Sequence, residues 1–204
     1  MLLVNNLKFE RSGKVIFENI HIAASPGKIV FIKGNNGTGK TTLLKTLVNI
    51  LEPNEGDIFW MGKKTKNNIF NFYQETTLIM DNPTSSLAMT VIENINFWKK
   101  ITSSKIKYEE IFKLLEMLRI DQYLKKQAMY LSLGEIKKLE LTRLILEQKK
   151  LWILDEPYIG LDGNSIEIIN ETFKDHLSNN GIIIFSSNYE PDFTNLDIIS
   201  LNSI

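Results

Sequence analysis

The chain has 204 residues, with 24 basic and 24 acidic side chains and no cysteine. A chain of this length favours one compact unit that buries roughly 70% of the surface exposed on unfolding. The balanced charge argues against nucleic-acid binding, and the absence of cysteine excludes disulfides and cysteine metal sites and fits a reducing compartment.

The first residues, MLLVNNLKFERSGK, do not resemble a secretory signal, because no basic segment precedes the apolar run and Asn5 and Asn6 interrupt it. No apolar run approaches the roughly 20 residues that span a bilayer. We therefore expect any role at a membrane to depend on another chain.

The first part of the chain alternates short apolar stretches with turn signals, which predicts strands at 2–9, 15–22 and 28–33. The third stretch is continuously apolar, as expected of a strand that is buried on both faces. Apolar residues at helical spacing then predict a helix over 41–51, and another short strand follows within 57–64.

The middle of the chain has helical patterns. Thr90 and Glu93 form a capping box at the start of the stretch 90–98, and one apolar stripe predicts a helix within 105–120. We therefore expect residues 84–130 to form a mostly helical lobe.

Strands and helices alternate again after this lobe. Strands are expected at 150–157, 181–188 and 196–201, with a helix around 164–178. This order predicts an α/β core that contains a helical insertion.

A glycine-rich stretch between the third strand and the first helix matches G-x-x-x-x-G-K-[ST] in full. Backbone amides in such a turn converge on phosphate oxygens, and the helix N-terminus adds positive partial charge. An ordinary glycine-rich turn is the alternative, but it does not explain the complete motif in this context. We expect Lys40 to reach the β- and γ-phosphates and Thr41 to ligate Mg²⁺. The expected contacts to ATP are Gly34, Asn35, Asn36, Gly37, Thr38, Gly39, Lys40, Thr41 and Thr42.

The stretch LWILDEP places two acids at the end of an apolar strand. Asp155 is expected to hold Mg²⁺, and Glu156 is expected to polarise the attacking water as a general base. The alternative is an exposed acidic strand end. The adjacent Asp–Glu pair favours hydrolysis over transfer of the phosphoryl group to another molecule.

The stretch LSLGEIKKLELTR, residues 131–143, contains a second capping box, formed by Ser132 and Glu135. Taken by itself, this turn is either only the start of a helix or a ligand contact as well.

Four motifs in order, GNNGTGKTT, LSLGE, LWILDEP and GLD at 160–162, make the chain resemble ABC-type ATPase subunits over essentially its whole length. The resemblance implies a single domain, 1–204, with a P-loop NTPase core of mixed sheet and flanking helices and an N-terminal antiparallel β portion. In that interpretation 1–83 and 131–204 form the α/β core, and 84–130 is the inserted helical subdomain.

The same resemblance implies that two copies of the chain enclose two ATP molecules head to tail. Ser132 and the backbone of Gly134 would then donate hydrogen bonds to the γ-phosphate held by the other copy. Asp162 resembles the aspartate through which the two sites communicate. ATP would close the dimer and hydrolysis would reopen it.

Within this family the chain most resembles the ATP-binding subunits of haem exporters in cytochrome c maturation. Its short length, the phrase LWILDEPYIGLD and the stretch MTVIENINFW after a nearby proline carry this likeness. It implies integral membrane partners docked on the helical subdomain and a peripheral location at the cytoplasmic face of the inner membrane. Phe97 and Trp98 are candidates for that docking surface or for the core of the lobe.

Some positions depart from the family pattern. In the LSLGE signature, Leu133 stands for a glycine and Glu135 for a glutamine, which puts a negative charge near a triphosphate. The glutamine that lines the Mg²⁺ and water site has its counterpart at Asn82, which keeps the amide on a shorter arm. Gln74 stands too close to the cradle for this role and is expected in a surface loop.

Asn188 occupies the position of the family's histidine after the last core strand, and it can donate a hydrogen bond but cannot become cationic. The loss of one transition-state contact costs about 10²–10³ in rate, so we expect slow hydrolysis that still depends on Glu156. Phe9 is the nearest aromatic residue for stacking on adenine, although Arg11 fits the spacing better, and Phe9 is equally a candidate for the core.

Two other functions compete with transport. A regulatory ATP-binding module with vestigial turnover is favoured by Leu133, Asn82 and Asn188. A soluble ABC ATPase of DNA repair or ribosome function is less consistent with the chain, because the cradle and the signature lie under a hundred residues apart and only one cassette is present.

Overall fold

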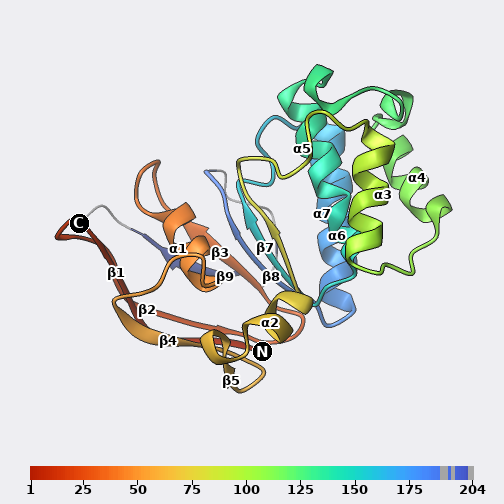
Figure 1. Cartoon of the computed structure of the whole chain (residues 1–204). Coiled ribbons are helices and arrows are strands. Elements are labelled where there is room, and N and C mark those ends of the chain that lie inside the picture. Colours follow the sequence, from red (N-terminus) through yellow and green to blue (C-terminus); the bar gives the residue numbers. More distant parts are fainter. Residues whose placement is uncertain (189–192, 194–195, 202–204) are drawn as a thin grey trace.

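The computed structural model describes residues 1–188, 193 and 196–201 and contains two sheets (Figure 1). The strands are β1 (Leu2–Arg11), β2 (Lys14–Ala24), β3 (Ile29–Lys33), β4 (Glu55–Trp60), β5 (Lys63–Lys64), β6 (Thr76–Ile79), β7 (Leu151–Asp155), β8 (Ile182–Ser186) and β9 (Leu196–Ser200). The α-helices are α1 (Lys40–Leu47), α2 (Ile69–Gln74), α3 (Val91–Ile101), α4 (Tyr108–Met117), α5 (Leu133–Leu141), α6 (Arg143–Glu147) and α7 (Gly163–Ser178).

The first sheet is antiparallel, in the order β2-β1-β4-β5, and the second is parallel, in the order β6-β7-β8-β3-β9. Helix α1 lies between the two sheets, and α5, α6 and α7 cover the other face of the parallel sheet (Figure 1). The predicted α/β core with an N-terminal antiparallel portion is therefore confirmed.

The parallel sheet is buried on both faces, which explains the continuously apolar strand sequences. On one face Leu43 and Leu47 of α1 share a core cluster with Ile153 of β7. On the other face Trp152 and Phe173, from β7 and α7, belong to a separate core cluster.

The helical lobe contains α3 and α4, as the sequence predicts, although α4 is shorter than the predicted stretch 105–120. Both bonds of the Thr90–Glu93 capping box are present at the start of α3. Trp98 is buried in the lobe core, whereas Phe97 is 47% exposed. Of the two, only Phe97 is placed where a partner could contact it.

The apolar cluster of the lobe runs on beyond residue 130. Ile136 and Leu139 of α5 and Leu146 of α6 pack with Val91 and Leu115 in the same cluster. Helix α5 therefore belongs by its packing to both the lobe and the core. The short helix α2 was not predicted, and α1 ends earlier than the predicted stretch 41–51.

His176, near the end of α7, stacks its ring on Trp152, with ring centroids 3.5 Å apart and an interplanar angle of 5°. Gly181 leaves room for this ring, because a Cβ at that position would lie 2.2 Å from His176 Nε2. Burial lowers the pKa of His176 to about 4.

We expect the half-buried, neutral His176 to make the fold sensitive to acid. Its pKa is depressed in the folded state, so the unfolded chain binds more protons between about pH 6.5 and 4, and stability falls as the pH falls through this window. His176→Phe keeps an aromatic ring against Trp152 and removes the titration. Urea unfolding at a series of pH values should show a shallower loss of stability in the variant, and equal slopes would contradict this interpretation.

Candidate functional site

The order of the parallel sheet brings the motif residues together. Strands β7, β8 and β3 are neighbours, with Asp155 in register with Ser186 and Ser186 in register with Ile32. The loops that follow the carboxyl ends of adjacent parallel strands meet at one edge of the sheet. Three segments distant in sequence therefore form one site.

The cradle between β3 and α1 is a tightly packed loop. A Cβ on Gly34 would lie 2.4 Å from Thr38 Oγ1 and 2.8 Å from the Leu201 carbonyl oxygen. Gly39 has a φ of 99° and is the N-cap of α1, where no side-chain cap bond forms and the first turn holds no acidic residue. The first amides of α1 are thus available to an anion.

Lys40 is buried at the start of α1. Its ammonium donates hydrogen bonds to the Gly34 carbonyl oxygen at 2.8 Å and to Asn188 Oδ1 at 2.9 Å, and it lies 3.5 Å from Glu156 Oε1. All of these contacts are to oxygen atoms. Phosphate oxygens can therefore take their place as acceptors for the Lys40 ammonium.

The Asp155 carboxylate is fully buried and is held at both oxygens. Thr41 Oγ1 donates to Asp155 Oδ2 at 2.7 Å, and Ser186 Oγ donates to Asp155 Oδ1 at 2.6 Å. Thr41 and Asp155 thus present two hard oxygen ligands side by side, a donor set that suits Mg²⁺. The sequence analysis missed Ser186, whose only signal was its place at the end of an apolar strand.

Glu156 has an unusual backbone conformation for a residue other than glycine, with a φ of 46°. Its N–H donates to the Ser186 carbonyl oxygen at 3.1 Å, and its Oε2 accepts from the Asn188 N–H at 3.1 Å. Strained backbone of this kind occurs at functional sites, where the surrounding structure holds it in place. The Glu156 side chain is therefore fixed at the site edge rather than projecting freely as an exposed strand end.

These side chains face a cavity of about 510 Å³. It is lined by Arg11, Ile16, Asn35, Asn36, Gly37, Gly39, Lys40, Thr41, Thr42, Asp81, Asp155, Glu156, Ile159 and Asn188. Its wall is polar at one end, with ammonium, carboxylate and backbone groups, and carries Ile16 and Ile159 as apolar surface. A slightly larger cavity of about 560 Å³ lies beside β4, and none of the motif residues lines it.

Asp81 lines the cavity. The next residue, Asn82, was predicted at the site, but it does not line the cavity and is exposed. The sequence analysis missed Asp81, which stands two residues after the end of β6. Gln74 is exposed, as expected, but it is the last residue of helix α2. It lines a different cavity, together with Trp60 and Lys150.

Phe9 is placed in the core, not at the cavity. Its side chain is 9% exposed, and its ring packs on Phe17 with centroids 5.9 Å apart. A buried ring inside the antiparallel sheet cannot stack on a base, so the core alternative replaces the adenine-stacking one. Arg11 and Ile16 are the residues of this region that reach the cavity.

The signature turn is on the surface, outside the chain's own cavity. Ser132 is exposed and caps α5, accepting from the Glu135 N–H at 3.2 Å while Glu135 Oε2 accepts from the Ser132 N–H at 2.7 Å. The predicted capping box is confirmed. Leu133 is 83% exposed, so this turn presents an apolar side chain to the outside.

Two contacts join the signature turn to the segment after β7. A Cβ on Gly134 would lie 2.3 Å from the Gly160 carbonyl oxygen, so the two backbones touch. Asp162 caps α7 by accepting from the Ser165 N–H, and it also pairs with Lys138 at 2.7 Å. The hydrogen bond from Lys138 lowers the pKa of Asp162.

Known proteins resemble the chain over most of its length. The ABC transporter family matches residues 17–159. A cytochrome c biogenesis ATP-binding export protein CcmA from Vibrio vulnificus is 33% identical, covering 93% of each chain. The protein of the same name from Reclinomonas americana is 34% identical, covering 99% of this chain and 91% of its own.

Solved structures agree in fold. A putative ABC transporter ATP-binding protein from Pyrococcus furiosus is 26% identical and superposes with a TM-score of 0.84, covering 98% of this chain and 96% of its own. The ATP-binding subunit of another ABC transporter has a TM-score of 0.83 at 24% identity, covering 92% and 79%, and this likeness concerns the fold alone.

We expect Gly134→Ala to destabilise the chain even without nucleotide or a second copy. The new Cβ meets the Gly160 backbone, and such overpacking costs about 1–3 kcal/mol. Gly163→Ala is the matched control, because its Cβ enters open space at the start of α7 and should be neutral or stabilising. Urea unfolding of both variants measures the difference, and equal stabilities would refute the close contact.

Proposed function

The chain belongs to the ABC transporter family as an ATP-binding subunit with ATPase activity, and on that premise we propose that it powers a haem exporter of cytochrome c biogenesis. The names of its relatives support the choice of exporter. The main structural support is that Lys40, Thr41, Asp155, Glu156 and Asn188 face one cavity from the ends of three neighbouring strands, β3, β7 and β8.

In this proposal the triphosphate of ATP lies against the backbone amides of residues 34–42. The Lys40 ammonium exchanges its contacts with Gly34 and Asn188 for β- and γ-phosphate oxygens. Asn35, Asn36 and Gly37 line the same cavity, and Thr38 supports the loop by donating to the Asn35 carbonyl oxygen at 2.9 Å.

Thr41 and Asp155 are proposed to hold Mg²⁺, which would offset the charge of the phosphates. Their hydrogen bond already places two oxygen donors together, and Ser186 fixes the carboxylate from its other side. Asp81 lines the same cavity, and Asn82 follows it in the chain, so the amide of Asn82 remains a proposed ligand through a rearrangement of this segment.

Glu156 is proposed as the general base that takes a proton from the attacking water. Its carboxylate accepts a hydrogen bond from the Asn188 N–H and lies 3.5 Å from the Lys40 ammonium. The residue that orients the base and the residue that would bind the phosphates therefore both contact Glu156. The Asn188 amide would donate to the γ-phosphate once Lys40 turns towards ATP. Without a cationic side chain at this position, turnover is expected to be slow.

Two copies are proposed to close on two ATP molecules. Ser132 and the Gly134 amide lie at the exposed N-terminus of α5, where an anion is favoured by the helix dipole. Asp162 is tied to the same helix through Lys138, which supports its proposed role in communication between the sites.

The helical lobe is the proposed docking surface for integral membrane subunits. Leu87, Phe97 and Ile101 are large apolar residues exposed there. Within the described residues, no helix has the length and apolar character needed to cross a bilayer. We propose a peripheral location at the cytoplasmic face of the inner membrane, where these integral subunits would hold the chain.

A regulatory ATP-binding module is the second candidate, and the exposed Leu133 favours it. A branched apolar side chain stands where the family has glycine, at the turn that would face the partner's phosphate. This candidate would be selected if the chain binds ATP but shows no phosphate release that Glu156→Gln abolishes.

We expect the tagged chain to co-purify from membranes with integral subunits of cytochrome c biogenesis, identified by mass spectrometry. Phe97→Asp should reduce this capture, because a charge would enter an apolar contact on the lobe. Phe70→Asp is the control, since Phe70 is 72% exposed on α2, outside the lobe, and its substitution should leave capture intact. Recovery of a different transporter, or no membrane partner, would contradict the exporter assignment.

We expect Asn188→His to raise the rate of ATP hydrolysis by at least about tenfold, because the imidazole adds a transition-state contact that Asn188 provides only weakly. Phosphate release from saturating Mg-ATP measures the change. Glu156→Gln, alone or combined with Asn188→His, should abolish turnover while leaving ATP bound. No gain from the histidine would argue against the proposed place of Asn188 at the γ-phosphate.

A further inference from the structure

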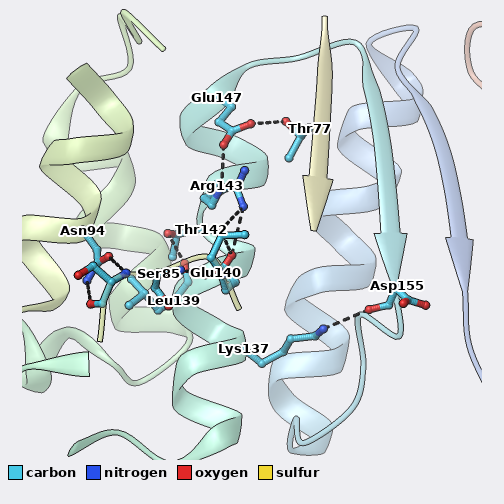
Figure 2. A network of polar contacts seen from close by, with 12 residues as sticks. Thr77, Ser85, Asn94, Lys137, Leu139, Glu140, Thr142, Arg143, Glu147 and Asp155 are labelled. Carbon is cyan, nitrogen blue, oxygen red and sulfur yellow. Dashed lines mark hydrogen bonds and ion pairs between the residues drawn. The ribbon is translucent and has the colours of Figure 1, made fainter. Parts of the chain in front are cut away.

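The segment that leaves β6 passes the nucleotide cavity and is then held by buried side chains of two helices. Asp81 lines the cavity, and three to five residues later the backbone N–H groups of Thr84, Ser85 and Ser86 all point to side-chain acceptors. Figure 2 shows these contacts within a wider polar network.

Glu140, on the last turn of α5, receives two of these amides. The Thr84 N–H donates to Glu140 Oε1 at 2.8 Å, and the Ser85 N–H donates to the same oxygen, while Thr84 Oγ1 donates to Oε2 at 3.0 Å. Glu140 is 2% exposed. A carboxylate this deeply buried is stable only when its oxygens are well paired, so these bonds hold the segment firmly.

Arg143 and Asn94 complete the arrangement. Arg143 Nη1 pairs with Glu140 Oε2 at 3.1 Å and donates to Thr84 Oγ1 at 2.9 Å. From α3, Asn94 Oδ1 accepts from the Ser86 N–H at 2.8 Å, and its amide donates back to the Ser86 carbonyl oxygen at 3.1 Å. The segment is thus bonded to the lobe and to α5 at once.

Helix α5 also contacts the cavity wall directly. Lys137, buried on the same helix, donates to the Asp155 carbonyl oxygen at 3.2 Å (Figure 2). Burial lowers the pKa of its ammonium, against the opposing effect of the Asp81 and Asp155 charges. The helix that begins at the signature turn is therefore bonded to both sides of its own subunit's cavity, at the end of β7 and at the segment after β6.

We propose that Glu140 is a positioning residue for the hydrolytic site of its own subunit. Its carboxylate fixes residues 84 and 85 to α5 and so sets where Asp81 stands at the cavity. This inference rests on the proposed function, since it assumes that the cavity hydrolyses ATP. If the signature turn moved, α5 would move with it, and the buried Glu140 carboxylate would transmit that movement to the segment beside the cavity of the same subunit.

Glu140→Ala tests the proposal in the full-length chain with Mg-ATP. It leaves the amides of Thr84 and Ser85 without an acceptor, and we expect kcat to fall by about tenfold or more, with little change in affinity for ATP, because Asp81 loses its fixed position at the cavity. Glu140→Gln keeps an oxygen for both amides and gives up the ion pair with Arg143 and the acceptor for Thr84 Oγ1. It should recover most of the lost kcat.

Thr77→Val is the matched structural control. Thr77 is buried and donates to Glu147 Oε2 at 2.8 Å, at the other end of the same network, where Arg143 Nε also pairs with Glu147. This variant should lose stability in urea and keep kcat. If Glu140→Ala and Thr77→Val lower stability alike and both keep kcat, the contact is merely structural and the proposal is overturned.

Deuterium exchange at the amides of residues 84–86 separates this proposal from the proposed function. We expect faster exchange there in Glu140→Ala and unchanged exchange in Thr77→Val, whatever the activity. If the unmodified chain releases no more phosphate from ATP than Glu156→Gln does, the proposed function fails, and the role of Glu140 in hydrolysis fails with it. Unchanged exchange in Glu140→Ala would overturn the positioning role by itself.

Discussion

The site depends on one buried charge, the carboxylate of Asp155. A carboxylate removed from water is costly unless hydrogen bonds replace its hydration, and here Thr41 and Ser186 donate to its two oxygens. Those donors come from α1 and β8, so satisfying one side chain fixes the relative positions of a helix and two strands. The strained backbone of Glu156 follows directly, and its N–H reaches the Ser186 carbonyl oxygen. The hydrogen bonds that orient the side chains of the cavity therefore also help to fix how β7 and β8 align in the sheet.

Much of this could be predicted from the sequence, because the phosphate cradle and the Asp–Glu pair carry their geometry in short, local motifs. Lys40, Thr41, Asp155 and Glu156 were predicted together and lie together. Ser186 and Asp81 were missed, since their only signal is a place at or shortly after the end of a strand. Their roles arise only when β8 and β6 take their places beside β7.

The errors of the sequence analysis have physical causes as well. Phe9, the nearest aromatic residue, was left open between adenine stacking and the core because the sequence alone does not tell which face of its strand is buried, and in the structure its ring packs on Phe17. Helix α2 is too short to show a periodic apolar pattern, so it was not predicted. The lobe appeared to end at residue 130 because a new capping box follows. Packing ignores that boundary, and Ile136 and Leu139 join the lobe core.

Helix α5 is consequently the element that the motif pattern describes least well. In sequence it is the start of a helix after a signature turn, and in the fold it contacts the lobe, the end of β7, the segment after β6 and the start of α7. Each contact uses a different one of four consecutive residues, about one helical turn: Lys137, Lys138, Leu139 and Glu140. A rigid helix cannot move at one of these points and stay still at the others. A force on its exposed N-terminus must therefore either be resisted by all four contacts or be transmitted to the cavity through them.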